Sequence, residues 1–456
     1  MKNRQPRGAR QKTEKSGTTT QASAASGTPS GTSLLIANAR VLDPASGFDA
    51  KGFVAVRDGR IASLGKTRPK GTFDRTLDAK GLWLIPGIVD LAVRLREPDQ
   101  TNNASIRSET RAAQSAGITS VVLPPDTRPV IDTPAMVDRI NGIARDCGGL
   151  DIHLLGALTR NLEGTALAGM SALRDAGCIG LSNAYAVLRD ALVARRALEY
   201  AHGLGLTVHV HAQDAALAAG GCAHEGPVAT RLGLPPIPAM AEVVALRFWI
   251  SLVEDTGAQV HFCRLSSARG ADLVRTAQQR GLPVTADVAA HQLFLTEHDL
   301  EGFNAQCHVV PPLRSLEDRG ALRAAVAEGV IGAICSDHQP LDADAKTNPF
   351  PLTEPGISAL ETLLPLTLRL VQEKVLEPLD AIARLSCGPA AIAGIGSGAL
   401  TAGMPAHLVL VDPAQRWILD AGDMASAGRN TPFAGHRFQG RAAVTLWHGR
   451  IVFSRL

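Results

Sequence analysis

Two strand-like runs of this chain carry side chains that could bind a metal ion. His209 and His211 lie two residues apart in LTVHVHAQD, so both point to one face of a strand. His261 and Cys263 share a face of the run AQVHFCRLS, and with His209 they offer nitrogen and sulfur ligands for a soft metal. Side chains inside barrel strands point into a packed core, so we favour hydrogen-bonded histidines over a metal site there.

Apolar strand-like runs alternate with helical runs between Pro86 and Gly394, and this alternation must position the candidate side chains. The strand-like runs include ITSVVLPPD, LDIHLLGAL, GCIGLSNA, LPVTADVAA and VIGAICSDH, and the helical runs include DALVARRALEYAHGLG and MAEVVALRFWISLVEDTG. Repeated alternation of this kind predicts an α/β fold, a (β/α)₈ TIM barrel over residues 86–394. Polar residues at the carboxyl ends of its strands, the barrel mouth, would then form any site.

Both ends of the chain have the alternating pattern of strands. Residues 34–85 contain LLIANARVL and FVAVRDGRIASLG, with a hairpin signal at Asp58-Gly59. Residues 395–456 contain HLVLVD and AAVTLWHGRIVF, with a turn at His448-Gly449. The simplest arrangement is one composite β-sandwich domain, built from both ends and flanking the barrel.

The first 33 residues form a basic segment with hardly an apolar side chain. Six Lys or Arg against Glu14 alone give it a net charge of +5, which leaves −2 for residues 34–456. Such a segment cannot bury enough apolar surface to fold, so we predict that residues 1–33 are a disordered tail. A docking arm for an acidic surface is the alternative. The mildly acidic remainder does not favour a nucleic-acid partner.

Cysteine usage and hydropathy indicate where the chain resides. The seven cysteines are odd in number and include no C-x-x-C pair, which favours a reducing compartment with free thiols over a structural zinc site. No apolar run reaches the roughly 18–20 residues of a membrane span, and the basic N-terminal segment lacks the apolar stretch of a secretory signal. We therefore expect a cytoplasmic protein with no membrane partner.

Five motifs resemble those of dihydroorotase, a member of the amidohydrolase superfamily. LIPGIVDLAVRLREP at residues 84–98 comes first. PPLR (311–314), SDHQP (336–340), PGISALET (355–362) and RNTPF (429–433) follow in family order and spacing. The resemblance covers nearly all of the chain after residue 33. It implies a barrel of the amidohydrolase type with a flanking β-sandwich, in agreement with the pattern of the runs.

The resemblance also implies a set of metal ligands, most of which this chain lacks. Active members hold one or two zinc ions. Their ligands are an H-x-H pair on the first barrel strand, a carboxylate or carbamylated lysine on the fourth, two further histidines, and the aspartate of a D-H-x-P segment, which is also the general base and acid. The only lysines between Pro86 and Gly394, Lys346 and Lys374, lie far from the fourth strand. The surviving family positions are His211 and Asp337, and the lost ones are Ala92, Arg94, Asn183 and Arg264.

The substitutions at these positions are unfavourable for a metal ion. A guanidinium is permanently charged and has no lone pair to donate, and at about 4 Å it would repel Zn²⁺ by roughly 8 kcal/mol at an effective dielectric constant of 20. Two surviving ligands are fewer than the three of a catalytic zinc site. We therefore expect no bound metal, a vestigial catalytic base at Asp337, and ion pairs from Arg94 and Arg264 to that carboxylate.

The positions that would bind the substrate in the family are altered as well. Arg96 matches the arginine that grips the substrate carboxylate, and we interpret it here as vestigial or as a structural loop contact. The asparagine expected after the third strand reads Asp126, which would repel an anionic substrate. The asparagine expected before Pro311 reads Val310, which donates no side-chain hydrogen bond.

The resemblance implies a non-catalytic dihydroorotase homologue of pyrimidine biosynthesis. In some bacteria, chains that look like this one assemble with aspartate carbamoyltransferase and are required for its active dodecamer. We therefore expect that enzyme as partner in a hetero-oligomer, and no cofactor. Two alternatives stay open. One is an active, zinc-dependent dihydroorotase (or, with less support, a hydantoinase or allantoinase) with a remodelled metal site, supported by His211, Asp337 and Arg96. The other is a sensor that binds a pyrimidine-like ligand without turnover.

Overall fold

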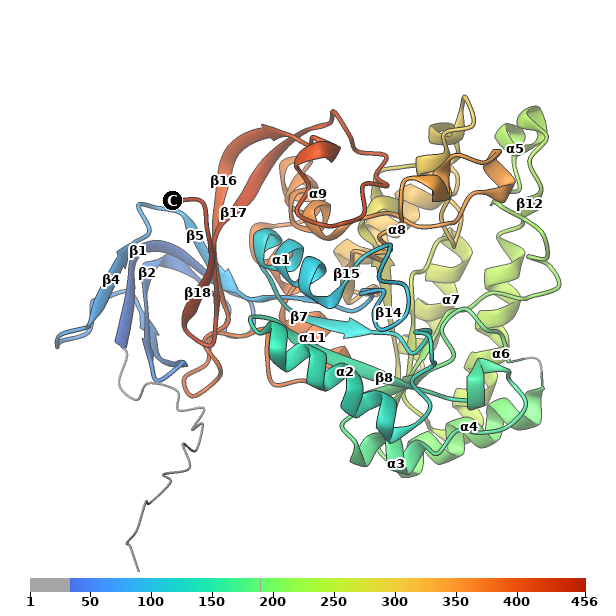
Figure 1. Ribbon diagram of the computed structural model, residues 1–456, viewed down its shortest axis with the longest axis horizontal. Coiled ribbons are helices and arrows are strands. Elements are labelled where there is room, and N and C mark those ends of the chain that lie inside the picture. The colour runs from blue at the N-terminus through green and yellow to red at the C-terminus, as the bar shows by residue number, and fades with distance from the viewer. Residues whose placement is uncertain (1–32, 189) are drawn as a thin grey trace, which may run out of the picture.

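The two ends of the chain join in one β-sheet beside a barrel (Figure 1). The computed structural model describes residues 33–188 and 190–456. The predicted disordered tail lies outside the described residues except for Ser33, which begins the first strand. The sheet has the order β18-β17-β16-β5-β1-β2-β3, with β4 paired to β1. Its strands are β1 (Ser33–Asp43), β2 (Phe48–Arg57), β3 (Arg60–Gly65), β4 (Arg75–Asp78), β5 (Trp83–Pro86), β16 (Leu408–Ile418), β17 (Arg437–Trp447) and β18 (Arg450–Ser454).

The pairing of β5 with β16 connects the two halves of this domain. The two strands run antiparallel, with Pro86 opposite Leu408 and Leu84 opposite Leu410. Apolar side chains of both halves pack in one cluster, which includes Ile36, Val41, Val54, Leu84, Leu408, Leu410 and Val444. The predicted turns at residues 58–59 and 448–449 both have positive φ at both positions, as two-residue hairpin turns require. The predicted flanking β-domain, built from both ends of the chain, is thus confirmed.

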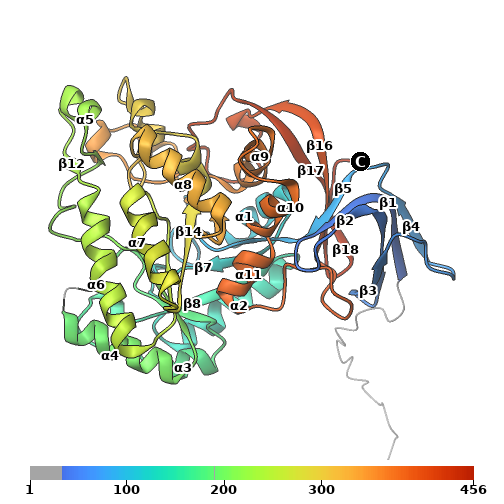
Figure 2. The ribbon, with the colours of Figure 1, turned by 180° about the vertical axis from the view of Figure 1, so that it is seen from behind.

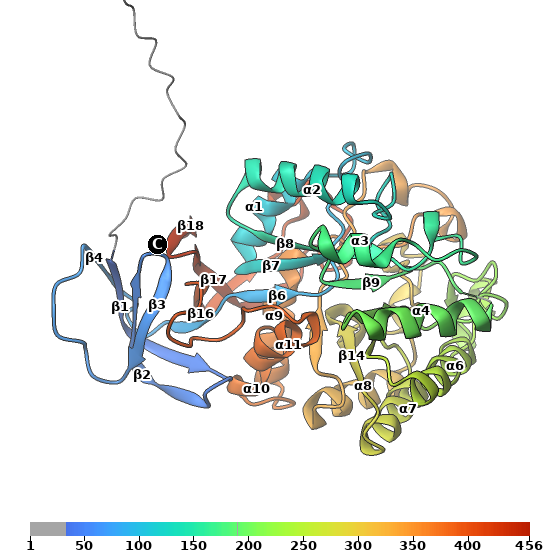
Figure 3. The ribbon, with the colours of Figure 1, turned by 90° about the horizontal axis from the view of Figure 1, so that it is seen from below.

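Eight parallel strands form the barrel, in the order β15-β14-β13-β10-β9-β8-β7-β6. Figure 3 shows β6 to β9 side by side, with α2, α3 and α4 outside them. The strands are β6 (Ile88–Asp90), β7 (Ile118–Leu123), β8 (Asp151–Ala157), β9 (Gly180–Ser182), β10 (Thr207–Val210), β13 (Val260–Phe262), β14 (Val284–Ala289) and β15 (Ala333–Cys335). The α/β fold class and the eight-stranded barrel are therefore confirmed.

Helices cover the outside of the barrel. They are α1 (Ile106–Ala116), α2 (Pro134–Cys147), α3 (Met170–Asp175), α4 (Ala191–Gly203), α6 (Met240–Thr256), α7 (Ala268–Gln279), α8 (Leu316–Glu328) and α9 (Leu360–Gln372). Three short elements, β11 (Ala223–His224), α5 (Pro227–Leu232) and β12 (Pro236–Ile237), extend from the mouth. Two more helices, α10 (Pro378–Ala383) and α11 (Cys387–Ala393), lie where the barrel meets the β-domain (Figure 2). No helix in the described ranges is long and apolar enough to cross a bilayer.

Local sequence explains where the first barrel helix begins and ends. Ser105 and Ser108 form a reciprocal capping box at the start of α1, which satisfies two backbone N–H groups. Gly117 ends the helix at φ 84°, in the left-handed region that favours glycine. A Cβ there would come within 2.9 Å of Val409 Cγ1 in β16. The same glycine therefore stops the helix and lets the β-domain approach the barrel.

The barrel is closed by contacts between the segments that follow β6 and β15. The Arg94 N–H donates to the carbonyl of His338, and the His338 N–H donates to the carbonyl of Ala92, each at 3.0 Å. Asp90 Oδ1 accepts from the backbone N–H of Ser336 at 3.0 Å and of Ala92 at 3.3 Å. The Asp90 carboxyl is fully buried, and its Oδ2 has no hydrogen-bond partner within the described residues. The closure thus depends on a carboxyl group with little solvation.

Because the buried Asp90 carboxyl lies at the barrel closure, we expect the stability of the fold to depend on pH. Asp90→Asn should reduce this dependence. Burial raises the pKa of Asp90 to about 7, so the folded chain keeps a proton that the unfolded chain loses near pH 4. The free energy of unfolding therefore falls as pH rises from about 4 to about 7, on the order of 1 kcal/mol per pH unit. An amide at this position does not titrate, and its oxygen can accept the same two hydrogen bonds.

We expect urea unfolding between about pH 5 and pH 7.5 to show a flatter pH dependence in Asp90→Asn than in the unmodified chain. Asp175→Asn, at a side chain that is 62% exposed, is the control and should keep the original dependence. Parallel pH profiles for all three chains would contradict the prediction.

Candidate functional site

Polar side chains from four strand ends meet at the barrel mouth. Arg94 follows β6, Asp126 follows β7, and Arg264 and Asp337 follow β13 and β15. Asp126 therefore follows the second barrel strand, and the prediction that it follows the third is wrong, because β7 is the first strand after β6. Arg264 (φ 57°) and Asp337 (φ 48°) have left-handed backbones, which cost a non-glycine residue on the order of 1–3 kcal/mol.

Two guanidiniums and two carboxylates form a buried cluster in the mouth, which we call the arginine cluster (Arg94, Arg264, Asp126 and Asp337). Asp337 Oδ1 lies 3.5 Å from Arg94 Nη1 and 3.4 Å from Arg264 Nη1. Arg94 also contacts Asp126 Oδ2, with Nε and Nη2 each at 2.9 Å. The predicted pairing of Asp337 with both arginines is confirmed. The positive and negative formal charges of the cluster are equal in number.

The carboxylates keep the arginines charged in spite of their burial. Burial alone would lower the pKa of Arg94, but Asp126 and then other groups, including Asp337, raise it above its ordinary value. Burial opposes the charge on Arg264 as well, and Tyr185 and Asp337 raise its pKa well above the ordinary value. Two of the four positions that bear ligating histidines in the family therefore carry a fixed positive charge.

Tyr185 lies between the two arginines and was not predicted as a site residue. Its ring centroid is 4.6 Å from Arg94 Cζ and 4.8 Å from Arg264 Cζ, within the range of a cation–π contact. Its hydroxyl donates to the Val310 carbonyl at 3.2 Å and accepts from Gln339 Nε2 at 2.9 Å. The only sequence signal is that the chain has two tyrosines and this one lies two residues after Asn183.

Asn183 holds the loop that carries Tyr185. Its Oδ1 accepts from Thr159 Oγ1 at 2.8 Å, and its Nδ2 donates to the carbonyls of Ala186 at 3.0 Å and Leu162 at 3.3 Å. Every hydrogen bond that its amide makes is directed to this loop and its neighbour. The residue at the family's carboxylate position is thus a structural brace.

His211 is the one surviving histidine position in the mouth. Its ring meets Tyr185 edge-on, with centroids 4.9 Å apart. Neither ring nitrogen has a hydrogen bond of normal geometry to the described residues. Burial, followed by the charges of Arg264 and Arg94, lowers the pKa of His211 well below its ordinary value. The imidazole is therefore neutral and lies beside two cations.

Two other predicted residues have structural contacts. His338 Nδ1 accepts from the Ala359 N–H at 3.0 Å, so its Nε2 carries the proton that is donated to Glu109 Oε2 at 2.8 Å. Arg96 Nε donates to the Pro340 carbonyl at 3.0 Å, and its Nη1 donates to Gln100 Oε1 at 3.1 Å. Burial and then the Arg94 charge lower the pKa of Arg96 to about 10. These contacts favour the interpretation of Arg96 as a loop contact.

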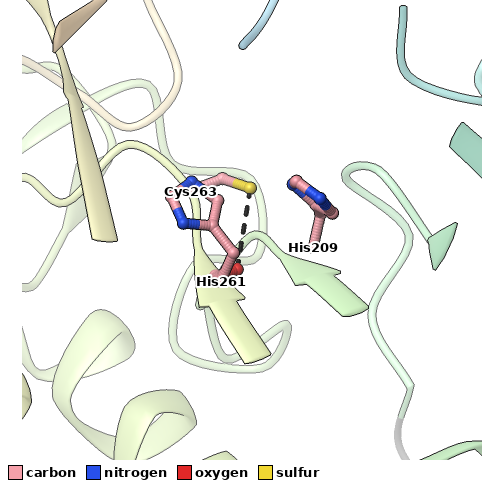
Figure 4. Close-up of side chains that lie close together, drawn as sticks. All are labelled: His209, His261 and Cys263. Atoms are coloured by element: carbon pink, nitrogen blue, oxygen red, sulfur yellow. Dashed lines mark hydrogen bonds between the residues drawn. The ribbon is translucent and has the colours of Figure 1, made fainter. Parts of the chain in front are cut away.

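His209, His261 and Cys263 do lie together, as their spacing allowed (Figure 4). Their candidate ligand atoms are all within 4.8 Å of one another. Both nitrogens of His261 are already engaged, Nδ1 with Thr285 Oγ1 at 2.8 Å and Nε2 with Asp287 Oδ2 at 3.0 Å. Burial raises the pKa of Cys263, so its sulfur stays a thiol. The contacts of His261 support a hydrogen-bonded core histidine there over a soft-metal site.

The residues in the mouth do not fit the zinc ions of active dihydroorotases. Asp337 Oδ1 is shared by two guanidiniums, and Asn183 is occupied in its loop. Ala92 offers no donor atom. Among the described residues at the family's ligand positions, His211 and Asp337 alone keep atoms that could ligate, and Asp337 is already ion-paired to two guanidiniums, while a catalytic zinc site uses three protein ligands.

The arginine cluster predicts that Asp337→Asn destabilises the fold. Removing the carboxylate leaves two buried guanidiniums under-compensated, and breaking a buried ion pair in this way costs about 3–5 kcal/mol. The exposed control Asp175→Asn should change the free energy of unfolding by less than about 0.5 kcal/mol.

A double-mutant cycle tests whether the effect of Asp337→Asn comes from the ion pair. Once Arg264→Met has removed one cation, Asp337→Asn should cost less than it does alone, with a coupling of more than about 0.5 kcal/mol in urea unfolding. Additive losses would show that the carboxylate acts independently of Arg264.

Comparisons with known proteins indicate one family. A family model for dihydro-orotase-like proteins matches residues 81–269. A dihydroorotase-like protein of Pseudomonas aeruginosa is 48% identical over 418 residues, which are 92% of this chain and 99% of that protein. A dihydroorotase-like protein of Pseudomonas putida is 47% identical over 92% of this chain and 98% of its own length. A dihydroorotase of Geobacter sp. is 38% identical over 92% of this chain and 99% of its own length.

A solved structure shows the same architecture at lower identity. L-hydantoinase (dihydropyrimidinase) from Arthrobacter aurescens has a TM-score of 0.84 at 23% identity, over 92% of this chain and 96% of that one. This likeness supports the fold alone. On the strength of the relatives that are 38–48% identical over 92% of its length, this chain belongs to the dihydroorotase-like family of the amidohydrolase superfamily.

Proposed function

We propose that this chain is a non-catalytic member of its family and serves as a structural subunit of aspartate carbamoyltransferase in pyrimidine biosynthesis. The observation that carries the proposal is the arginine cluster. Asp337, at the position of the family's general base, contacts a cation on each side instead of a metal ion. The charges of the arginine cluster are therefore balanced by side chains of the chain itself.

The cluster supports a loss of hydrolytic chemistry in two ways. Opening a cyclic amide requires a nucleophile near the carbonyl carbon and a group that accepts its proton. The metal that activates water in the family has too few ligands here, and Asp337 Oδ1 is shared by Arg94 and Arg264. Tyr185 fills the space between the two arginines, and the loop that carries it is braced by Asn183.

The proposal of this partner rests on the resemblance described above. In some bacteria, chains that look like this one are required for the assembly of aspartate carbamoyltransferase. A barrel that keeps its fold without zinc could fill that role, because assembly needs a stable surface and no catalytic group. The dihydroorotase-like relatives in Pseudomonas, 47% and 48% identical, are more similar to this chain than the dihydroorotase of Geobacter sp. at 38%.

A second candidate is an active dihydroorotase with a remodelled metal site. It is favoured by the 38% identity to the dihydroorotase of Geobacter sp. and by the family residues that this chain keeps, His211, Asp337 and Arg96. Asp126 weighs against it, although as the partner of Arg94 it is less able to repel an anionic substrate than an unpaired carboxylate would be. Turnover separates the two candidates.

We expect no hydrolysis of dihydroorotate above background by the purified chain, with or without added Zn²⁺. The matched variant restores the family's donors through Ala92→His, Arg94→His, Asn183→Asp and Arg264→His, and should gain zinc binding at the mouth. Ring opening by the unmodified chain that requires zinc and is abolished by His211→Gln would overturn the proposal in favour of the active enzyme.

We also expect the chain to co-purify with aspartate carbamoyltransferase from its native cells. Deleting the gene for this chain should lower the molecular mass of the transcarbamoylase in gel filtration and reduce its activity. Complementation with the Asp337→Glu variant, which keeps the negative charge, should restore both. A transcarbamoylase of unchanged mass and activity in the deletion strain would count against the structural role.

A further inference from the structure

Three side chains with metal-ligand chemistry meet where the barrel joins the β-domain, on the side away from the mouth. Asp151 begins β8, His407 directly precedes β16, and His448 lies in the turn between β17 and β18. The His407 Nε2 to Asp151 Oδ2 distance is 3.6 Å, and the His448 Nε2 to Asp151 Oδ1 distance is 3.8 Å. The candidate ligand atoms of all three residues lie within 4.8 Å of one another.

We propose that Asp151, His407 and His448, the junction triad, bind one divalent transition-metal ion such as Zn²⁺. In a tetrahedral site with bonds of about 2.1 Å, two ligand atoms lie about 3.4 Å apart. The two distances from the histidines to Asp151 are close to this value and are too long for good hydrogen bonds. Small side-chain movements would therefore bring both imidazoles and the carboxylate onto one ion.

The environment of His407, the buried histidine of the triad, indicates that it is a metal ligand and not merely a polar contact of Asp151. His407 is 4% exposed, and neither of its ring nitrogens has a hydrogen-bond partner among the described residues. Buried polar groups are rarely left in this state in native proteins. Its Nε2 has no partner in the protein and lies on the side of the Asp151 carboxylate, where an ion could bind it.

Neighbouring contacts fix two of the three ligands in place. Trp447 Nε1 donates to Asp151 Oδ1 at 2.8 Å, which orients the carboxylate as outer-shell partners do in metal sites. The Gly87 N–H donates to the His407 carbonyl at 2.8 Å, and a Cβ on Gly87 would come within 2.9 Å of the His407 Cβ. The backbone of His407 is therefore held closely by the turn between β5 and β6.

The triad differs from the mouth in its access to solvent. The His448 side chain is 42% exposed and lines a cleft of about 540 Å³, whose walls also carry Arg60, Arg75 and Arg450 together with Asp58 and Asp74. An ion would reach the triad from the His448 side. Three protein ligands leave a fourth position for water, and the bound ion would tie β8 of the barrel to two segments of the β-domain.

Calorimetric titration of the full chain with Zn²⁺ tests the proposal. We expect one ion per chain, and at least about tenfold weaker binding in both His448→Gln and Asp151→Asn. The control His202→Gln removes an exposed histidine on α4 and should bind as the unmodified chain does. His448 is largely exposed, so its variant should melt normally without metal, and the rise in melting temperature caused by Zn²⁺ should be lost.

Other outcomes would overturn the junction site. They are an absence of saturable binding in the unmodified chain, or unchanged affinity in both His448→Gln and Asp151→Asn. Titration with Co²⁺ should give no thiolate charge-transfer band, and such a band would assign the ion to Cys263 instead. Binding that is lost in His211→Gln would place the ion in the mouth and would refute the proposed function as well, whereas simple failure of the junction site leaves that proposal intact.

Discussion

A carboxylate buried between two guanidiniums is the constraint on which the mouth of this barrel depends. Charges with little access to water must be compensated locally, because their desolvation is not repaid by solvent. Asp337 compensates Arg94 and Arg264, and Asp126 completes the balance on the Arg94 side. Arg264 and Asp337 have left-handed backbone conformations. These are tolerated because the ion pairs and the surrounding strands hold both residues in place.

Several substitutions relative to active dihydroorotases make sense together once this constraint is stated. Asp126 appeared unsuitable when considered as a substrate contact, but it is the closest partner of Arg94. Asn183 lacks the charge of the family's carboxylate ligand, and its amide makes hydrogen bonds that hold a loop. That loop places Tyr185 against both arginines. In the structure, contacts between side chains of the chain itself hold the mouth together.

Much of the fold was predictable because its signals are local. Alternating apolar runs indicated the barrel, and Asp58-Gly59 and His448-Gly449 marked hairpins at opposite ends of the chain. The pairing of Asp337 with two arginines followed from charge alone. Tyr185 and the Arg94–Asp126 contact could not be foreseen, since they depend on how the loops fold over the mouth. The junction triad is even harder to predict from the sequence. Its members lie in β8, before β16 and after β17, and no spacing rule connects these positions.

The antiparallel pairing of β5 with β16 also has a consequence for biosynthesis. As the ribosome releases the chain, β1 to β5 emerge before the barrel, while β16, which covers one edge of β5, is synthesised after all the barrel strands. Until residue 408 has left the exit tunnel, that edge is open to pairing with another nascent chain. The β-domain therefore closes only after the barrel has been synthesised, and a chaperone that shields this edge during translation would protect the yield of native protein.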